Sequence, residues 1–229
     1  MSAKKKPLPA QESPTKDRRS KGERTRERIL DATLAVIADQ GLRGVTHRAV
    51  AGEAGVQTSL TTYYFKDIED LIEQAFKLFC QRSRPGYQAF WKQVFTYLDG
   101  YGRSELRKNA VREQVCADLA HRATGYLVSQ VREKPQGLAV EQVFFTASTL
   151  SPTLKALATE HRDNLLAPVI ELCSRFNRLD PEIDAELLLN TLSRLEYEAL
   201  NTDPENVNSD AMERRVRRQL GWGLGLRGA

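Results

Sequence analysis

A short segment in the first third of the chain constrains the fold more than any other part of it. The segment reads Val45-Thr46-His47-Arg48-Ala49-Val50-Ala51-Gly52-Glu53-Ala54-Gly55-Val56. The Thr46 hydroxyl can cap the first turn of a helix, and Gly55 can adopt the left-handed conformation that ends one. Between them, Ala51 and Ala54 are small enough to let another helix approach closely. The segment therefore predicts a short helix, a sharp turn at Gly55 and a second helix that follows at once.

The second helix is expected from about Thr58 to Tyr64, and its composition is unusual for a helix. Residues 58–65 read Thr-Ser-Leu-Thr-Thr-Tyr-Tyr-Phe, which is rich in β-branched and aromatic side chains. Tertiary packing rather than local preference must hold such a helix. Its hydroxyl groups can bond phosphate oxygens or base edges, and threonine methyls can contact thymine methyls. Phe65, in contrast, is expected in the core.

A longer amphipathic helix is predicted to precede these two. Apolar residues recur at helical spacing from Ile29 to Ile37, the helix is expected to begin near Lys21, and Gly41 is placed to end it. Residues 1–20 combine three prolines with polar and charged residues and show no periodicity. That composition predicts a disordered basic arm.

The distribution of charge indicates a polyanionic partner for the N-terminal part only. Residues 1–66 contain 13 lysines and arginines against 7 aspartates and glutamates, a net charge of +6, whereas the whole chain carries +4. The rest of the chain is therefore slightly acidic. Nucleic acid is the commonest polyanion that binds a basic domain, and a solvated basic tail without a partner is the alternative.

The chain after Asp67 keeps a helical pattern. Asp67 can cap a helix with an apolar stripe from Ile68 to Phe79, and Pro85-Gly86 is expected to break or kink it. Further helices are expected over roughly 87–98, 104–134, 138–149, 153–177, 182–201 and 208–220. No strand, no internal repeat, no secretory signal and no apolar run of membrane-spanning length is found in the sequence. We therefore expect an all-α protein of the cytoplasm that does not enter a membrane.

The stretch from Gly41 through Leu71 resembles the TetR family of bacterial transcriptional regulators. The resemblance is carried by Thr46, Val50-Ala51, Ala54-Gly55-Val56, Tyr64-Phe65 and Asp70-Leu71, and it is specific over about residues 22–82. It implies an N-terminal tri-helical helix-turn-helix DNA-binding domain over residues 21–66, with the motif at 46–65. It also implies a C-terminal helical domain over residues 67–229 that binds an effector and dimerises. The predicted function is a sequence-specific transcriptional regulator, a repressor that a small molecule releases from a palindromic operator of double-stranded DNA, with no cofactor and no metal.

The resemblance also assigns the DNA contacts. It implies that Thr46 and Arg48 contact the DNA backbone and that the second short helix lies in the major groove. Gln57 can bond adenine, although the family more often has serine there, and Thr62 stands where the family often has tyrosine. The expected DNA-binding residues are Thr46, Arg48, Gln57, Thr58, Ser59, Thr61, Thr62, Tyr63, Tyr64 and Lys66.

The resemblance further implies that the last two long helices form a four-helix dimer interface. The candidates are Leu187, Leu188, Thr191, Leu195, Leu200, Met212 and Val216, with Ile183, Asn190, Ala199, Val207 and Leu220 on the same helices. Their spacing suits helix-on-helix packing, and a monomer that buries the same residues internally is the alternative.

The effector pocket is expected among the helices between about residues 87 and 177. Large apolar surface is available from Phe90, Trp91, Phe95, Cys116, Tyr126, Phe144 and Phe145, and a polar contact from Glu113, His121 or His161. This lining favours an apolar or acyl-type effector. Each of these side chains can equally belong to the ordinary core or surface.

Two other classes of function stay open at this point. An enzyme is disfavoured, because His121 and His161 lack metal-ligand spacing or a carboxylate motif and no phosphate-binding glycine motif occurs in the sequence. The three cysteines are far apart, which favours free thiols. A helical scaffold that used its basic arm as a tether would bind no specific DNA sequence.

Overall fold

The computed structural model describes residues 14–147, 150–177 and 179–226, and these residues form nine α-helices and no strand. The helices are α1 (Pro14–Gln40), α2 (His47–Ala54), α3 (Thr58–Tyr64), α4 (Ile68–Leu98), α5 (Asn109–Glu133), α6 (Pro135–Thr146), α7 (Pro152–Phe176), α8 (Pro181–Ala199) and α9 (Ser209–Gly223). Two 3-10 turns, Leu42–Gly44 and Pro204–Asn206, lie between helices. The expected all-α class is confirmed.

The first helix is longer than the sequence indicated. It begins at Pro14, whereas we expected it near Lys21 after an arm that ended at residue 20. Proline suits the first turn of a helix, and the lysines, arginines and glutamate that follow are good helix formers, which explains the earlier start. The remainder of the expected arm, residues 1–13, lies outside the described residues.

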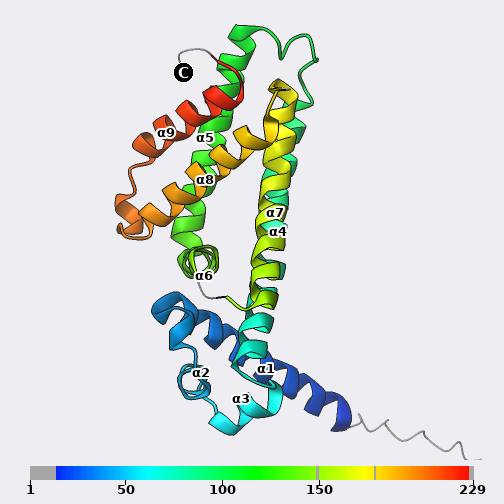
Figure 1. The fold of residues 1–229 in the computed structure, drawn as a ribbon, viewed down its shortest axis with the longest axis vertical. Helices are drawn as coiled ribbons and strands as arrows, with labels where there is room; N and C mark the ends of the chain where they lie inside the picture. Colours follow the sequence, from blue (N-terminus) through cyan, green and yellow to red (C-terminus); the bar gives the residue numbers. More distant parts are fainter. Residues whose placement is uncertain (1–13, 148–149, 178, 227–229) are drawn as a thin grey trace, which may run out of the picture.

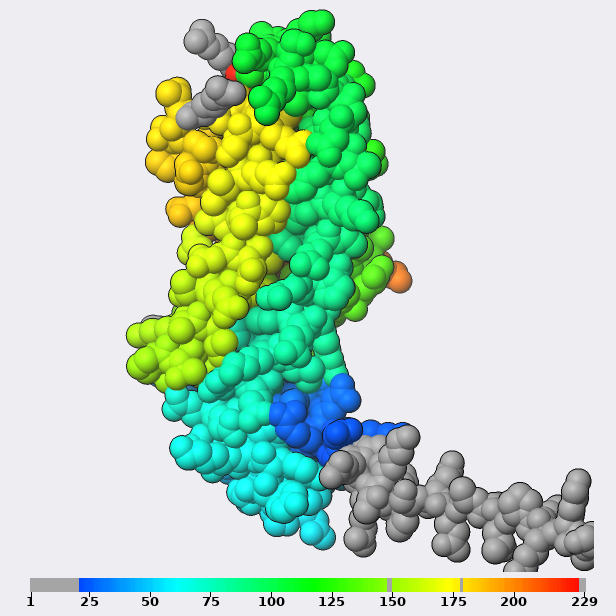
Figure 2. Space-filling model, turned by 90° about the vertical axis from the view of Figure 1, so that its right-hand side faces the viewer, coloured from blue at the N-terminus to red at the C-terminus, as the bar shows by residue number. Residues whose placement is uncertain are grey.

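The helices are arranged as a small N-terminal domain at one end of a longer helical body (Figure 1). Helices α1, α2 and α3 form the N-terminal domain, and α4 runs from it along the length of the molecule beside α7. Helix α5 packs against α9 and α8, and α6 lies across the junction, in contact with α1. The space-filling view shows α4 and α7 side by side, with the N-terminal domain below them (Figure 2).

Helix α4 is continuous, so of the break or kink expected at Pro85 the break is wrong. Its 31 residues make it roughly 45 Å long. Pro85 is exposed, so the carbonyl of Gln81 that loses its helical partner can bond water. On the inner face, Phe76 precedes the proline and Trp91 follows it, and both are buried. Burial on both sides therefore holds the two halves together as one helix.

Two hydrophobic cores stabilise the chain. The first gathers α1, α2 and the start of α4, and it also takes Val140 and Phe144 from α6 and Leu154 from α7. The second lies among the upper parts of α4 and α7 and helices α5, α8 and α9. Because α6 and α7 contribute to the first core, the N-terminal domain is packed onto the body.

The other helix boundaries agree with the expected ones to within a few residues, with two shifts. Helix α5 begins at Asn109 and not near residue 104, because Glu105 accepts a hydrogen bond from the Gly102 amide (2.7 Å) in a series of turns. Helix α6 begins at Pro135 and ends at Thr146, about three residues earlier than expected at both ends. Proline at its first position explains the early start.

Candidate functional site

The segment around α2 folds as its sequence predicts. The Thr46 hydroxyl accepts a hydrogen bond from the Ala49 amide (3.0 Å), so Thr46 caps α2. Gly55 ends the helix with φ 61° and ψ 41°, and the Val56 amide donates to the Ala51 carbonyl (3.0 Å). Such a left-handed turn suits glycine, because a side chain there would be strained. The turn directs α3 away from α2.

Helix α3 separates into a buried side and an outer face. Leu60 is partly buried and Thr61 and Phe65 are buried, so tertiary packing holds a helix of poor intrinsic propensity, as expected. The outer face, which we define as Thr58, Ser59, Thr62 and Tyr63, is exposed. Tyr63 projects furthest, with 79% of its surface accessible.

The prediction that Thr61 contacts DNA is wrong. Its side chain is fully buried, and its hydroxyl donates to the Thr58 carbonyl (2.7 Å). Nδ1 of His47 lies 2.9 Å from the same oxygen, and because the hydroxyl proton is already used, the imidazole must donate this bond. The hydrogen bond between Thr61 and His47 therefore joins α3 to α2. Sequence reasoning missed this role of His47.

The other expected DNA-binding residues lie at or beside the outer face of α3. Thr46, Arg48, Gln57 and Lys66 are exposed, and these assignments stay predictions. Tyr64 is partly buried: its ring packs edge-on against Tyr63 (5.0 Å), and its hydroxyl lies beside Gly22 of α1.

Polar contacts hold α3 at a fixed angle to its neighbours. Arg28 of α1 donates to the Ala54 carbonyl at the end of α2 (2.6 Å). Arg26 lies over the Phe65 ring (5.4 Å). Asp67 caps α4 by accepting from the Asp70 amide (2.8 Å), which confirms the expected cap. The two arginines thus join α1 to the end of α2 and to Phe65, the residue that follows α3.

A cavity of about 420 Å³ lies in the body of the molecule, walled by α4, α5, α6, α7 and α8. Its volume falls in the range of small-molecule sites. Four of the ten expected pocket residues line it: Phe90, Trp91, Tyr126 and His161. Phe90 stacks on Tyr126 (4.5 Å) and meets Trp91 edge-on (5.5 Å), so aromatic rings form a continuous wall.

Three expected pocket residues on α5 lie away from this cavity. Glu113 is exposed, Cys116 is buried with its thiol 3.4 Å from the Arg217 carbonyl of α9, and His121 is exposed beside Glu213 of α9 (3.1 Å). The reason is helical phase, because this part of α5 turns these side chains toward α9 and solvent.

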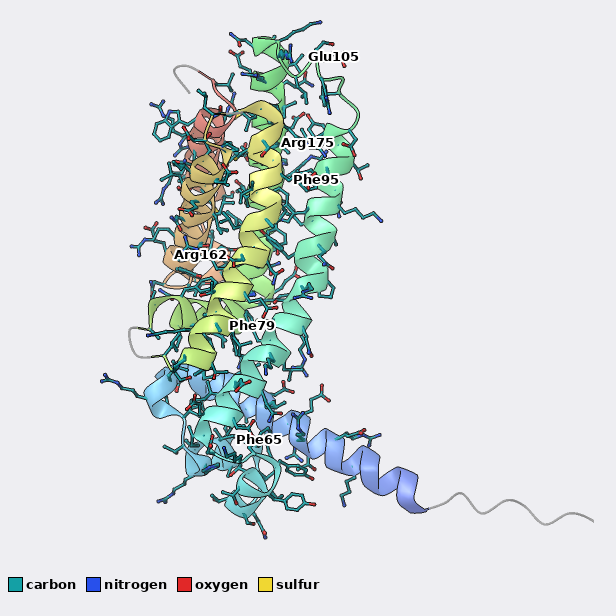
Figure 3. All side chains as sticks on the ribbon, turned by 45° about the vertical axis from the view of Figure 1, so that its right-hand side comes forward. Phe65, Phe79, Phe95, Glu105, Arg162 and Arg175 are labelled. Atoms are coloured by element: carbon teal, nitrogen blue, oxygen red, sulfur yellow. The ribbon has the colours of Figure 1, made fainter. Side chains whose placement is uncertain are left out.

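Three expected aromatic residues also lie outside the cavity lining. Phe95 stacks on Trp91 and is covered by Arg175 (4.9 Å), near the upper ends of α4 and α7 (Figure 3). Phe144 stacks on Phe76 (3.8 Å) in the core of the N-terminal domain. Phe145 stacks on His161 (5.7 Å) without lining the cavity.

An ion pair stands in the cavity wall. Nε2 of His161 lies 2.8 Å from a Glu141 carboxylate oxygen, and the Tyr197 hydroxyl donates to the other oxygen (3.2 Å). Burial opposes a charge on His161, but Cys80 and Glu141 beside it raise the pKa of the imidazole to about 9. The imidazole therefore carries its proton at neutral pH. Sequence reasoning selected His161 but missed its partner Glu141.

A second buried carboxyl group, Glu196, also lines the cavity and was missed. It is 8% exposed, and burial together with the nearby Glu141 carboxylate raises its pKa well above the ordinary value. A signal existed in the sequence, because Glu196 follows Leu189 and Leu192 at helical spacing on the same face of α8.

His161 also contacts the aromatic residues that join the body to the N-terminal domain. Its ring meets Phe76 (5.8 Å) and Phe79 (5.6 Å) of α4 edge-on. Phe76 belongs to the core of the N-terminal domain, and Phe79 lies on α4 above that domain (Figure 3). The cavity wall and the N-terminal domain thus share packed side chains.

The structure corrects the expected dimer interface. Leu188, Leu195, Met212 and Val216 are buried in the protomer's own core, because α8 and α9 turn these positions toward α5 and α7. The prediction that these four contact a partner is therefore wrong. Leu187 is 52% exposed, and Thr191 and Leu200 are partly buried.

Helices α8 and α9 also carry large apolar residues that the protomer leaves exposed. Besides Leu187, they are Ile183 at 58% and Trp222 at 53% exposure, and Arg218 lies over the Trp222 ring (5.3 Å). Trp222 was not among the expected interface residues.

In the described part of the chain, no helix is both long and apolar enough to span a bilayer. No group of three or more metal-binding side chains comes together among the described residues. The three cysteines are free, with Cys116 and Cys173 buried and Cys80 partly buried.

The chain is similar to known regulators in sequence and in fold. Residues 29–75 match the family described as bacterial regulatory proteins, tetR family. The HTH-type transcriptional regulator BetI of Serratia proteamaculans (strain 568) is 24% identical over 170 residues, which is 74% of this chain and 76% of that protein.

Two solved structures illustrate the shared fold. A transcriptional regulator from Rhodococcus sp. Rha1 has a TM-score of 0.65 at 20% identity, over 87% of this chain and 96% of that chain. The transcriptional regulator FadR from Bacillus subtilis, in complex with stearoyl-CoA, has a TM-score of 0.57 at 18% identity, over 86% of this chain and 98% of that chain.

Proposed function

The chain belongs to the TetR family of bacterial helix-turn-helix transcription regulators, which bind DNA and are not enzymes, and from this premise we propose that it is a repressor. In this proposal two copies bind a palindromic operator and a small-molecule effector releases them. Such a protein acts in the cytoplasm, on the chromosome.

The observation that carries the proposal is the exposed outer face of α3. Thr58, Ser59, Thr62 and Tyr63 present hydroxyl groups at the end of the molecule, with Arg48 exposed on the neighbouring helix. Hydroxyl groups can bond base edges and phosphates, and an arginine can hold the DNA backbone. A short outward helix of this kind fits the major groove.

The test measures binding to duplex DNA from upstream of the protein's own gene by fluorescence anisotropy. Arg48→Ala is expected to weaken binding to every sequence and to lower the slope of log affinity against log salt by about 1, because a phosphate contact carries no sequence information. The matched control is Arg103→Ala. Arg103 is exposed in the loop between α4 and α5, at the end of the molecule remote from α3, and it should leave affinity unchanged. Equal losses in both variants would contradict the proposal.

Base preference is expected to depend on different residues from overall affinity. Tyr64→Ala should weaken binding across all sequences, whereas changes at Gln57 or Ser59 should alter which bases are preferred. Selection on randomised operators measures both effects. Unchanged preference in both the Gln57 and Ser59 variants would remove them from the base contacts.

The proposed dimer uses the exposed face of α8 and α9. Ile183, Leu187 and Trp222 give this face its apolar surface, which a second copy related by two-fold symmetry would cover. Two α3 helices then face half-sites about 34 Å apart or a multiple of that distance.

The effector is proposed to bind in the cavity and to act through α4 and α6. Glu141 of α6 and His161 of α7 pair in the cavity wall, His161 contacts Phe76 and Phe79 of α4, and both α4 and α6 pack on α1. A ligand that moves this pair also moves the helices that hold the N-terminal domain. It releases DNA only if it binds the released arrangement more tightly.

The aromatic walls suit a largely apolar effector, of which an acyl-type ligand is one class. FadR of Bacillus subtilis, which shares the fold, was solved with stearoyl-CoA. A thermal-shift screen of hydrophobic acids and aromatic compounds, followed by operator release with each hit, tests this part of the proposal. A hit that stabilises the protein and leaves operator affinity unchanged would contradict it.

A further inference from the structure

The ionisable side chains that line the cavity fall into an exposed group and a buried group. Lys77, Arg84 and Lys134 are exposed, as is Glu160. Glu141, Glu196 and His161 are buried, each at 9% exposure or less. The buried part of the lining therefore holds two carboxyl groups and one imidazole.

Glu196 is the carboxyl group without a partner. Glu141 accepts hydrogen bonds from His161 and Tyr197, at 2.8 and 3.2 Å. Across the described ranges, no group donates a hydrogen bond to the Glu196 carboxyl. A buried carboxylate without a partner is strongly disfavoured, so Glu196 is either protonated or neutralised by something that enters the cavity.

We propose that the cavity binds an organic cation of drug size, whose positive charge is neutralised by Glu196. The inference rests on the proposed function only in identifying this cation as the effector. It narrows the ligand class, because an acyl chain would leave Glu196 unpartnered.

The walls of the cavity support a cation independently of Glu196. Phe90, Trp91 and Tyr126 present adjoining aromatic rings, and the faces of such rings attract cations. The volume of about 420 Å³ accommodates a ligand with an aromatic body. An anion at the same depth would gain no ion pair there, because Glu196 would have to stay protonated beside it and the Glu141 carboxylate already pairs with His161.

The test compares two ions of nearly the same shape and opposite charge. Tetraphenylphosphonium and tetraphenylborate are titrated into the wild-type full-length protein by calorimetry, with dodecanoate as the acyl probe. We expect the phosphonium ion to bind about tenfold more tightly than the borate, or better. Tighter binding of the borate, or binding of dodecanoate alone, would overturn the inference without the use of any variant.

Variants then assign the charge preference to Glu196. Glu196→Gln keeps the shape of a protonated glutamate and should weaken the phosphonium ion by about tenfold or more, as expected when one partner of a buried ion pair is removed. Glu160→Gln, the same change at an exposed lining residue, should alter its affinity by less than about threefold. A Glu196→Gln protein that melts normally and binds the phosphonium ion as the wild type does would refute the assignment.

Operator binding in the same samples separates this inference from the proposed function. A phosphonium ion that binds through Glu196 without changing operator affinity supports the cation site and contradicts ligand-controlled repression. Release of the operator by dodecanoate alone supports the proposed function and overturns the cation site.

Discussion

The buried pair of His161 and Glu141 should make the stability of the protein depend on pH in a calculable way. The folded protein raises the pKa of His161 from 6.5 to about 9. A raised pKa means that the folded state binds the proton more tightly than the unfolded chain does. The resulting stabilisation is complete below pH 6.5 and is lost as pH rises through 9. A shift of this size corresponds to about 3 kcal/mol.

The assay is urea unfolding of the wild type and His161→Gln between pH 6 and 10, at one fixed protein concentration. The stability difference between the two proteins should shrink by about 3 kcal/mol over this range, because only the wild type carries the titrating imidazole. The control is His121→Gln. His121 also pairs with a glutamate, Glu213, but its side chain is 82% exposed, so its removal should produce no comparable pH dependence. Parallel pH profiles for the wild type and His161→Gln would refute this reasoning.

Three further predictions concern the N-terminal domain and the dimer. Gly55→Ala should destabilise the protein by about 1–2 kcal/mol, because φ is 61° there. Gly52→Ala lies inside α2, where the added methyl group meets no neighbouring atom, and should stabilise the protein by about 0.5–1 kcal/mol. If urea unfolding showed that both substitutions stabilise the protein, or that both destabilise it, the assigned backbone would be contradicted. Thr46→Ala removes the cap of α2 and should cost about 1 kcal/mol in the same assay, so an unaltered midpoint would speak against the cap. Leu187→Glu should shift sedimentation equilibrium toward the monomer while the helical circular dichroism stays the same, and a persistent dimer would place the interface elsewhere.

Local signals predicted the cap of α2, the turn at Gly55 and the cap of α4. Thr46, Gly55 and Asp67 act on the backbone within a few residues, so their roles can be deduced from the sequence without the fold. Thr61 shows the limit of such reasoning. Its hydroxyl has the chemistry of a DNA contact, but the rotation of α3 turns it toward His47.

The positions of the proposed dimer face and of the cavity depend on how long helices are rotated against one another. Helix α8 has apolar residues on two sides, and its sequence does not say which side the protomer buries; Leu188 and Leu195 proved internal, while Leu187 is exposed. The cavity gathers side chains from five helices, so no local pattern could place Glu141 beside His161.

In the proposed function the outer face of α3 reads duplex DNA, once in each protomer of a two-fold dimer. Hydroxyl-radical footprinting on the DNA upstream of the gene, at moderate salt, tests it most directly. We expect two symmetric protected patches on one face of the duplex, with centres separated by about one helical turn or a multiple of it. If the protein protected no specific sequence of this DNA, or protected a single asymmetric patch, that result would contradict the proposal.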